Sequence, residues 1–200
     1  MIKQISKKVA KSLCESTHNN NNVDIYEYAI YITINSAIHI ISTIALGLLF
    51  NVFIESLIFY GAFIIVRKFT GGYHAKTPFR CYLFSITSIT FFMFLIKGTL
   101  QIKNTSLSWG ILAFAFISVI LIILYAPLES VNNLPLNQKE RLTYNKISVI
   151  SSVSILFIAC FLEVLELHFI SISMGCALIM VGVVIFMSMI NSTLIRKIEE

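Results

Sequence analysis

Long apolar segments separated by short polar gaps dominate the chain from residue 29 to residue 190. A helix needs about 20 residues to cross a hydrocarbon core about 30 Å thick, and this pattern is typical of such helices. It predicts an all-α fold, a polytopic membrane helical bundle with about six transmembrane or partly inserted helices. The six segments lie at 29–50, 52–66, 81–96, 107–126, 147–162 and 169–190.

Three of these segments, 52–66, 81–96 and 147–162, are shorter than a full crossing requires. We expect them to tilt little, to end at thinned bilayer or to fail to cross fully. Glu55 lies near one end of its segment, where an interface tolerates a carboxylate better than the bilayer midplane does.

Ahead of the bundle, residues 1–24 form an amphipathic segment. Residues 1–16 predict a basic helix lying on an anionic leaflet, although an ordinary solvated helix packed on the bundle fits equally well. The apolar face holds Ile2, Ile5, Val9 and Leu13, and the other face holds Lys3, Lys7, Lys8 and Lys11.

Composition excludes an ordinary soluble domain: 57% of the residues are hydrophobic, 12% are charged and the mean hydropathy is +0.84. No linker or internal repeat divides the chain, so residues 1–200 are expected to form a single integral membrane domain with the bundle at 29–190. The basic residues behind the net charge of +5 lie in the gaps between apolar segments. This placement indicates that they set the orientation in the membrane and contact lipid headgroups. A nucleic-acid partner is therefore not expected.

The Lys and Arg residues are distributed unevenly among the gaps. Thirteen fall at the two termini and in alternate gaps, and two fall in the remaining gaps. Because a positive excess marks the cytoplasmic side, this predicts six crossings with both termini in the cytoplasm. The polar interval 67–85 is then also cytoplasmic.

Reactive side chains converge in this interval, RKFTGGYHAKTPFRCYLFS. Gly71 and Gly72 allow the backbone to leave one helix and turn back. Pro78 suits the first position of the next helix, with Thr77 as its N-cap, so Cys81 falls in the first turn.

A thiol at that position is favoured as the thiolate by the positive end of the helix and by the neighbouring Arg80. Backbone N–H groups of Phe79, Arg80 or Cys81 are candidates to hold an oxyanion. His74, in the preceding loop, is the candidate general base and acid. These residues predict a catalytic Cys–His pair, but spacing alone is also compatible with packing and headgroup contacts.

Metal and disulfide chemistry have less support. Two ligands do not make a zinc site, and no cofactor is expected. The other three cysteines, Cys14, Cys160 and Cys176, are irregularly spaced and are interpreted as reduced structural residues.

The pattern R-x3-GG-x-H-A-x5-C-x3-S, spanning Arg67 to Ser85, resembles the defining motif of the accessory gene regulator protein B family. The length, the number of apolar segments and the polar gap 126–146 are similar as well. The family comprises bacterial multi-pass membrane endopeptidases that process precursors of cyclic autoinducing peptides in quorum sensing. The resemblance implies His74 and Cys81 as the catalytic pair, release of the precursor's carboxyl-terminal tail, thiolactone formation, and a homodimer in the cell membrane.

Several points remain open at the level of sequence. Ser85 is either a supporting residue one turn after Cys81 or a helix-pairing serine. Glu129 is a second candidate for a third catalytic residue, in a gap that either solvates or receives the precursor. Gly175 and Gly182 permit close helix contact of the kind a dimer requires. A small transporter or a non-enzymatic scaffold of a signalling system are the alternative functions.

Overall fold

The computed structural model describes residues 6–12, 23–71, 78–102, 104–128 and 137–199. These ranges are helical apart from the connections and contain no strand beyond an isolated bridge between Gly71 and Leu128. The predicted all-α class is confirmed. A short helix covers residues 6–12. The long helices are α2 (Val23–Phe50), α3 (Phe53–Thr70), α4 (Pro78–Ile102), α5 (Thr105–Tyr125), α6 (Gln138–Val164) and α7 (His168–Glu199).

Two helices are longer than their apolar segments indicated. Helix α4 has 25 residues and α6 has 27, which at 1.5 Å per residue gives lengths of about 37 and 40 Å. The prediction that segments 81–96 and 147–162 are too short to cross was therefore wrong. Polar residues continue both helices: α6 begins with exposed turns over 138–144, and Glu140 Oε2 accepts a hydrogen bond from the Asn137 N–H at 3.1 Å.

Five helices are long and apolar enough to cross a membrane, namely α2, α4, α5, α6 and α7. Helix α3 has 18 residues, with Glu55 in its first turn and Arg67 and Lys68 in its last. These charged side chains, at the two ends of a short helix, are more favourable at the membrane–water interfaces than in the hydrocarbon core. The described helices thus fit a multi-pass membrane protein.

Contacts divide the chain into two compact units, residues 1–45 and residues 46–200. Within the first unit, the helix over 6–12 buries Ser6 and Ala10 and exposes Lys7, Lys8 and Lys11. Val9, expected on the apolar face, is 41% exposed. The single-domain organisation and the position of this helix on a leaflet stay predictions.

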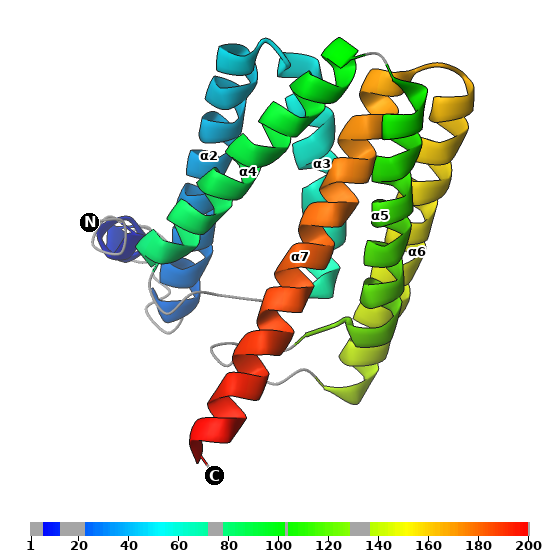
Figure 1. Cartoon of the computed structure of the whole chain (residues 1–200). Helices are drawn as coiled ribbons and strands as arrows, with labels where there is room; N and C mark the ends of the chain where they lie inside the picture. Colours follow the sequence, from blue (N-terminus) through cyan, green and yellow to red (C-terminus); the bar gives the residue numbers. More distant parts are fainter. Residues whose placement is uncertain (1–5, 13–22, 72–77, 103, 129–136, 200) are drawn as a thin grey trace. The chain divides into compact units, whose positions relative to one another are not determined.

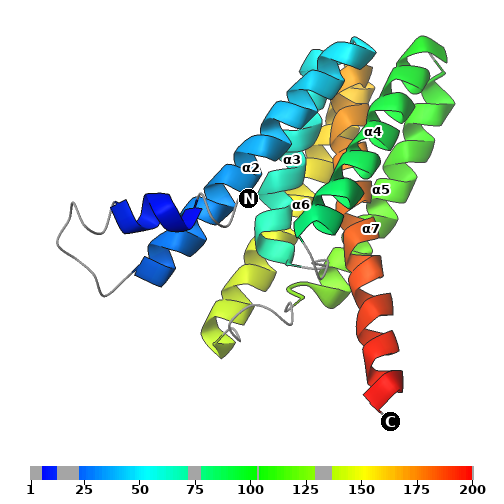
Figure 2. The same ribbon diagram turned by 90° about the vertical axis from the view of Figure 1, so that its left-hand side faces the viewer.

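Helix α7 is the centre of the second unit. It packs against α3, α4, α5 and α6, and the ribbon views show it running between them (Figures 1 and 2). Its buried residues are spaced to face several neighbours, as expected of a helix surrounded by protein. They include Ile172, Cys176, Ala177, Leu178, Val181 and Ile185.

Two glycines of α7 lie close against α5. A Cβ atom on Gly182 would lie 2.7 Å from Ser118 Cβ and 3.2 Å from Ser118 Cα, and one on Gly175 would lie 3.1 Å from a methyl group of Ile111. Both glycines therefore face α5 of the same chain. The small residues that suggested a dimer contact are used within the protomer, and homodimerisation stays a prediction without their support.

Candidate active site

The last turn of α3 leads directly into the reactive interval. The helix ends at Thr70, and Gly71 follows with a φ of +64°. This left-handed conformation suits glycine because it has no Cβ atom. The glycine that was expected to end this helix is therefore confirmed at Gly71.

Gly71 is also held against a distant part of the chain. The Leu128 N–H donates to the Thr70 carbonyl oxygen at 2.9 Å, and Gly71 and Leu128 form a parallel bridge. A methyl group at Gly71 would collide with the Leu128 carbonyl oxygen. The segment that follows α5 thus contacts the backbone at the point where α3 ends.

This segment is in turn anchored to α6. The side-chain amide Nδ2 of Asn145 donates to the Ala126 carbonyl oxygen at 2.5 Å, and the Ala126–Pro127 peptide bond is cis. One residue earlier on α6, the Tyr144 ring meets the Phe69 ring edge-on, with centroids 5.9 Å apart. The ends of α3 and α5 and the first turns of α6 are therefore joined by specific contacts.

Helix α4 begins at Pro78, as predicted, and Cys81 lies partly buried in its first turn. The partly buried Arg67 of α3 interacts electrostatically with Cys81. Burial lowers the pKa of the Arg67 guanidinium to about 10, and the negative charge of a Cys81 thiolate acts in the opposite direction and raises it. Arg67 therefore stays protonated at neutral pH and places a positive charge near Cys81.

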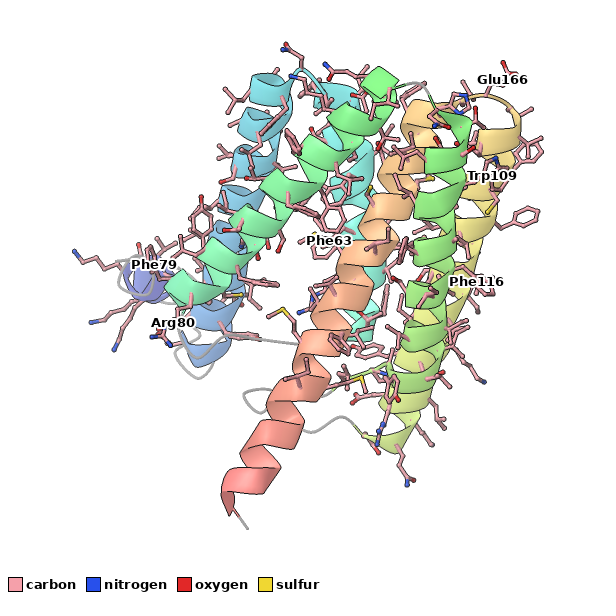
Figure 3. The ribbon with its side chains drawn as sticks, in the orientation of Figure 1. Phe63, Phe79, Arg80, Trp109, Phe116 and Glu166 are labelled. Atoms are coloured by element: carbon pink, nitrogen blue, oxygen red, sulfur yellow. The ribbon has the colours of Figure 1, made fainter. Side chains whose placement is uncertain are left out.

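The other predicted site residues are placed as follows. Phe79 and Arg80 precede Cys81 on α4, and their side chains are exposed (Figure 3). Because α4 begins at Pro78, the backbone amides of both residues lie in its first turn, where helices leave N–H groups unpaired. Ser85 lies one turn after Cys81 and is partly buried. His74, Gly72, Thr77 and Glu129 lie outside the described residues.

Sequence reasoning assigned the cation beside Cys81 to Arg80 and not to Arg67. Arg67 is the first residue of the sequence motif, so the motif could have pointed to a role for Arg67 at the site. Asn145 gave no signal, because its partner Ala126 is 19 residues away along the chain. Leu128 was missed for the same reason, since its contact with Gly71 depends on how the helices pack.

A second set of polar residues lies at the other end of α4. His168 begins α7, and its Nδ1 lies 2.8 Å from Oε1 of the buried Glu163. A cavity of about 370 Å³ adjoins His168. Its lining comprises Thr99, Leu100, Asn104, Thr105, Ser108, Glu166, His168, Phe169 and Ile172. Within the described part of the chain, no three His, Cys, Asp or Glu residues are grouped as a metal site would require.

The fold and this geometry define a class: a multi-pass helical membrane protein with a cysteine in the first turn of one helix and a cation beside it. The sequence profile described as Accessory gene regulator B matches residues 2–193. The chain therefore belongs to the Accessory gene regulator B family, which acts in accessory gene regulation and quorum sensing.

Individual relatives agree with this assignment. AgrB-like protein 2 of Clostridium perfringens (strain 13 / Type A) is 33% identical over 171 residues, which cover 84% of this chain and 78% of the relative. Accessory gene regulator protein B of Staphylococcus lugdunensis is 28% identical over 167 residues, covering 79% of this chain and 85% of the relative. No solved structure matches the chain.

Proposed function

We propose that this protein is a membrane-embedded cysteine endopeptidase that processes the precursor of a cyclic autoinducing peptide for quorum sensing. The observation that carries the proposal is the position of Cys81, in the first turn of a membrane helix and in electrostatic contact with Arg67. The motif shared with the family adds His74 as the second member of a catalytic pair.

In the proposed reaction, Cys81 Sγ attacks a peptide carbonyl carbon of the precursor, and His74 accepts the thiol proton. His74 then protonates the departing amine, so that the acidic carboxyl-terminal tail leaves and a thioester remains on Cys81. First-turn amides of α4 are candidates to hold the oxyanion. A cysteine thiol of the precursor next attacks the thioester, which closes a thiolactone ring and returns Cys81 as a thiol.

The exchange of one thioester for another is nearly balanced in free energy, so cyclisation requires no nucleotide. Competing hydrolysis must be limited, and a membrane-embedded wall would help to exclude water. The precursor expected from the family resemblance has an amphipathic leader. Binding of that leader to the same leaflet would raise its concentration near Cys81.

A transport function has less support from the described side chains. Glu163, near the end of α6, is the only charged residue buried among them. Several buried serines bond to the backbone of their own helices, as Ser118 does to Phe114 and Ser173 does to Phe169. Hydroxyl groups used in this way do not form a continuous polar path across the bundle.

The uneven distribution of Lys and Arg supports a cytoplasmic active site with both termini on the same side of the cell membrane. Single-cysteine variants at Gln101 and Lys139, made without the native cysteines, test this orientation. In vesicles with the cellular orientation, an impermeant maleimide should label Q101C directly and K139C only after permeabilisation. The reverse labelling pattern would place Cys81 outside.

Catalysis is tested with purified protein in lipid nanodiscs and a candidate precursor that has a leader, an internal cysteine and an acidic tail. Cys81→Ala and His74→Ala should each reduce cleavage by on the order of 1000-fold. Cys160→Ala is the matched control, because Cys160 is also a partly buried free thiol but lies on α6. Mass spectrometry should detect a peptide acylating Cys81, and cleavage at the normal rate by Cys81→Ala would refute the assignment.

A further inference from the structure

We propose that the cavity beside His168 binds a small organic cation, a primary ammonium group attached to an apolar body. The cavity has a volume of about 370 Å³, which lies within the range of protein sites for small organic ligands. It is at the end of α4 opposite Cys81. The inference is independent of the endopeptidase proposal, because it uses neither member of the catalytic pair.

The cavity combines buried and exposed lining residues. Thr99, Ser108 and Ile172 are at most 5% exposed and form its inner part. Asn104 and Glu166 are exposed and form its rim, and Figure 3 shows Glu166 at the turn that joins α6 to α7. A ligand can therefore enter from the surface and lose its contact with bulk water as it reaches the inner residues.

The polar side chains of the lining offer hydrogen-bond acceptors. The Thr99 hydroxyl donates to the Leu95 carbonyl oxygen at 2.8 Å, so its lone pairs are what it can offer a ligand. Glu166 adds the oxygens of a carboxylate at the rim. An ammonium group carries three N–H donors and no acceptor, so it matches this lining.

His168 connects the cavity to a buried carboxylate. Its Nδ1 lies 2.8 Å from Glu163 Oε1, and Glu163 Oε2 is buried with no hydrogen-bond partner within the described ranges. Because Nδ1 is engaged by Glu163, Nε2 is the ring nitrogen left for a ligand. Wherever the proton of this pair lies, Glu163, His168 and Glu166 together carry a net negative charge. That charge attracts a cation and repels an anion.

Apolar side chains complete the lining. Leu100, Phe169 and Ile172 provide a surface for the carbon body of a ligand, and the face of the Phe169 ring can also contact a cation. A neutral apolar molecule would fill the cavity but give Glu166 and His168 no partner. An ammonium group on an apolar body satisfies both kinds of lining residue.

The test uses full-length protein in detergent micelles, with carbon-13 in the isoleucine methyl groups. The probe is phenethylammonium chloride, and the readout is the NMR signal of Ile172, which lines the cavity. Ile155 is the matched control methyl, because it is buried on α6 and does not line the cavity. The Ile172 signal should shift saturably with an apparent Kd of about 1 mM, while the Ile155 signal stays in place.

Variants and analogues test the charge. Glu166→Gln keeps the size of the exposed side chain and should weaken binding of the probe about fivefold. Glu55→Gln, at the start of α3 and outside the cavity, should leave the Kd within about 1.5-fold. Phenethyl alcohol, which replaces the ammonium with a hydroxyl group, should bind at least about fivefold more weakly than the probe. Hydrocinnamate, an anion of similar size, should give no saturable shift.

Three results would overturn the inference. Equal shifts of Ile172 and Ile155 would indicate partition of the probe into the micelle. Equal affinity for phenethyl alcohol and phenethylammonium would indicate an apolar cavity without selection for charge. Tighter binding of hydrocinnamate would reverse the sign of the proposed ligand. None of these results would bear on the assignment of Cys81.

Discussion

The Cys81 end and the Glu163 end of the second unit use polar groups in different ways. Cys81 and Thr99 are both on α4, and their separation of 18 positions corresponds to about 27 Å at 1.5 Å per residue. At the Cys81 end, the interacting groups come from α3, α4, α6 and the segment after α5. At the other end, Glu163 and His168 are neighbours across one tight turn.

This difference separates a reactive arrangement from a structural one. The Glu163–His168 pair lies five positions apart in sequence, and the turn that joins α6 to α7 brings the two residues together. The Cys81 end instead combines a cation, a nucleophile and hydrogen bonds to backbone carbonyls from distant parts of the chain. The contacts at the Cys81 end depend on the packing of the whole bundle. Substitutions at the Cys81 end should therefore affect activity more than equivalent substitutions at the Glu163 end.

The largest effect is expected for Gly71→Ala. The new methyl group collides with the Leu128 carbonyl, and the positive φ is unfavourable for alanine, which together should destabilise the protein by about 3 kcal/mol. Precursor cleavage should fall as well. Thermal unfolding in detergent measures the first effect. Gly61→Ala, within α3, is the control, because a Cβ there meets nothing within 4 Å, and it should unfold at or above the normal temperature.

At the opposite end, His168→Ala should separate stability from activity. It leaves the Glu163 carboxylate buried without its imidazole partner, where side-chain exposure is 0% for Glu163 and 38% for His168. A loss of about 2 kcal/mol in unfolding free energy is expected. Cleavage below the unfolding temperature should stay within about twofold of normal, and a tenfold loss would show that the two ends are functionally coupled.

Arg67→Met tests the cation at the Cys81 end. Removal of the guanidinium takes away the positive charge that interacts with Cys81, so alkylation of Cys81 near neutral pH should slow by about tenfold. Lys68→Met is the matched control, because its ammonium lies over the Phe69 ring, 5.6 Å from the centroid. Equal slowing in both variants would assign the effect to general surface charge.

The smallest effect is expected for Glu166→Gly, which should increase the unfolding free energy. Glu166 occupies the turn after α6 with a φ of +62°, while Leu167 N–H bonds to the Leu162 carbonyl at 3.0 Å. Glycine adopts this conformation more readily, so the variant should gain about 0.5–1 kcal/mol in unfolding free energy. Calorimetric unfolding in detergent would measure the gain, and a loss would indicate that the carboxylate has a role in the adjoining cavity.

The sequence alone was sufficient for the all-α membrane class and the junction between α3 and α4. Apolar periodicity identifies helices because their burial in lipid or protein depends on side chains that are local in sequence. Gly71 and Pro78 mark the junction because their backbone preferences are properties of single residues. Helix ends were harder to predict, since the polar first turns of α6 remain helical without contributing to an apolar segment.

Tertiary structure decided which distant groups meet at Cys81. The role of Arg67 depends on how α3 packs beside α4, and that of Asn145 depends on the path of the chain after α5. Gly175 and Gly182 likewise have the same local preferences whether they face α5 or a second protomer, and only packing assigned them to α5. Such contacts arise from the shape of the whole bundle, because residue types and spacing do not specify which faces meet.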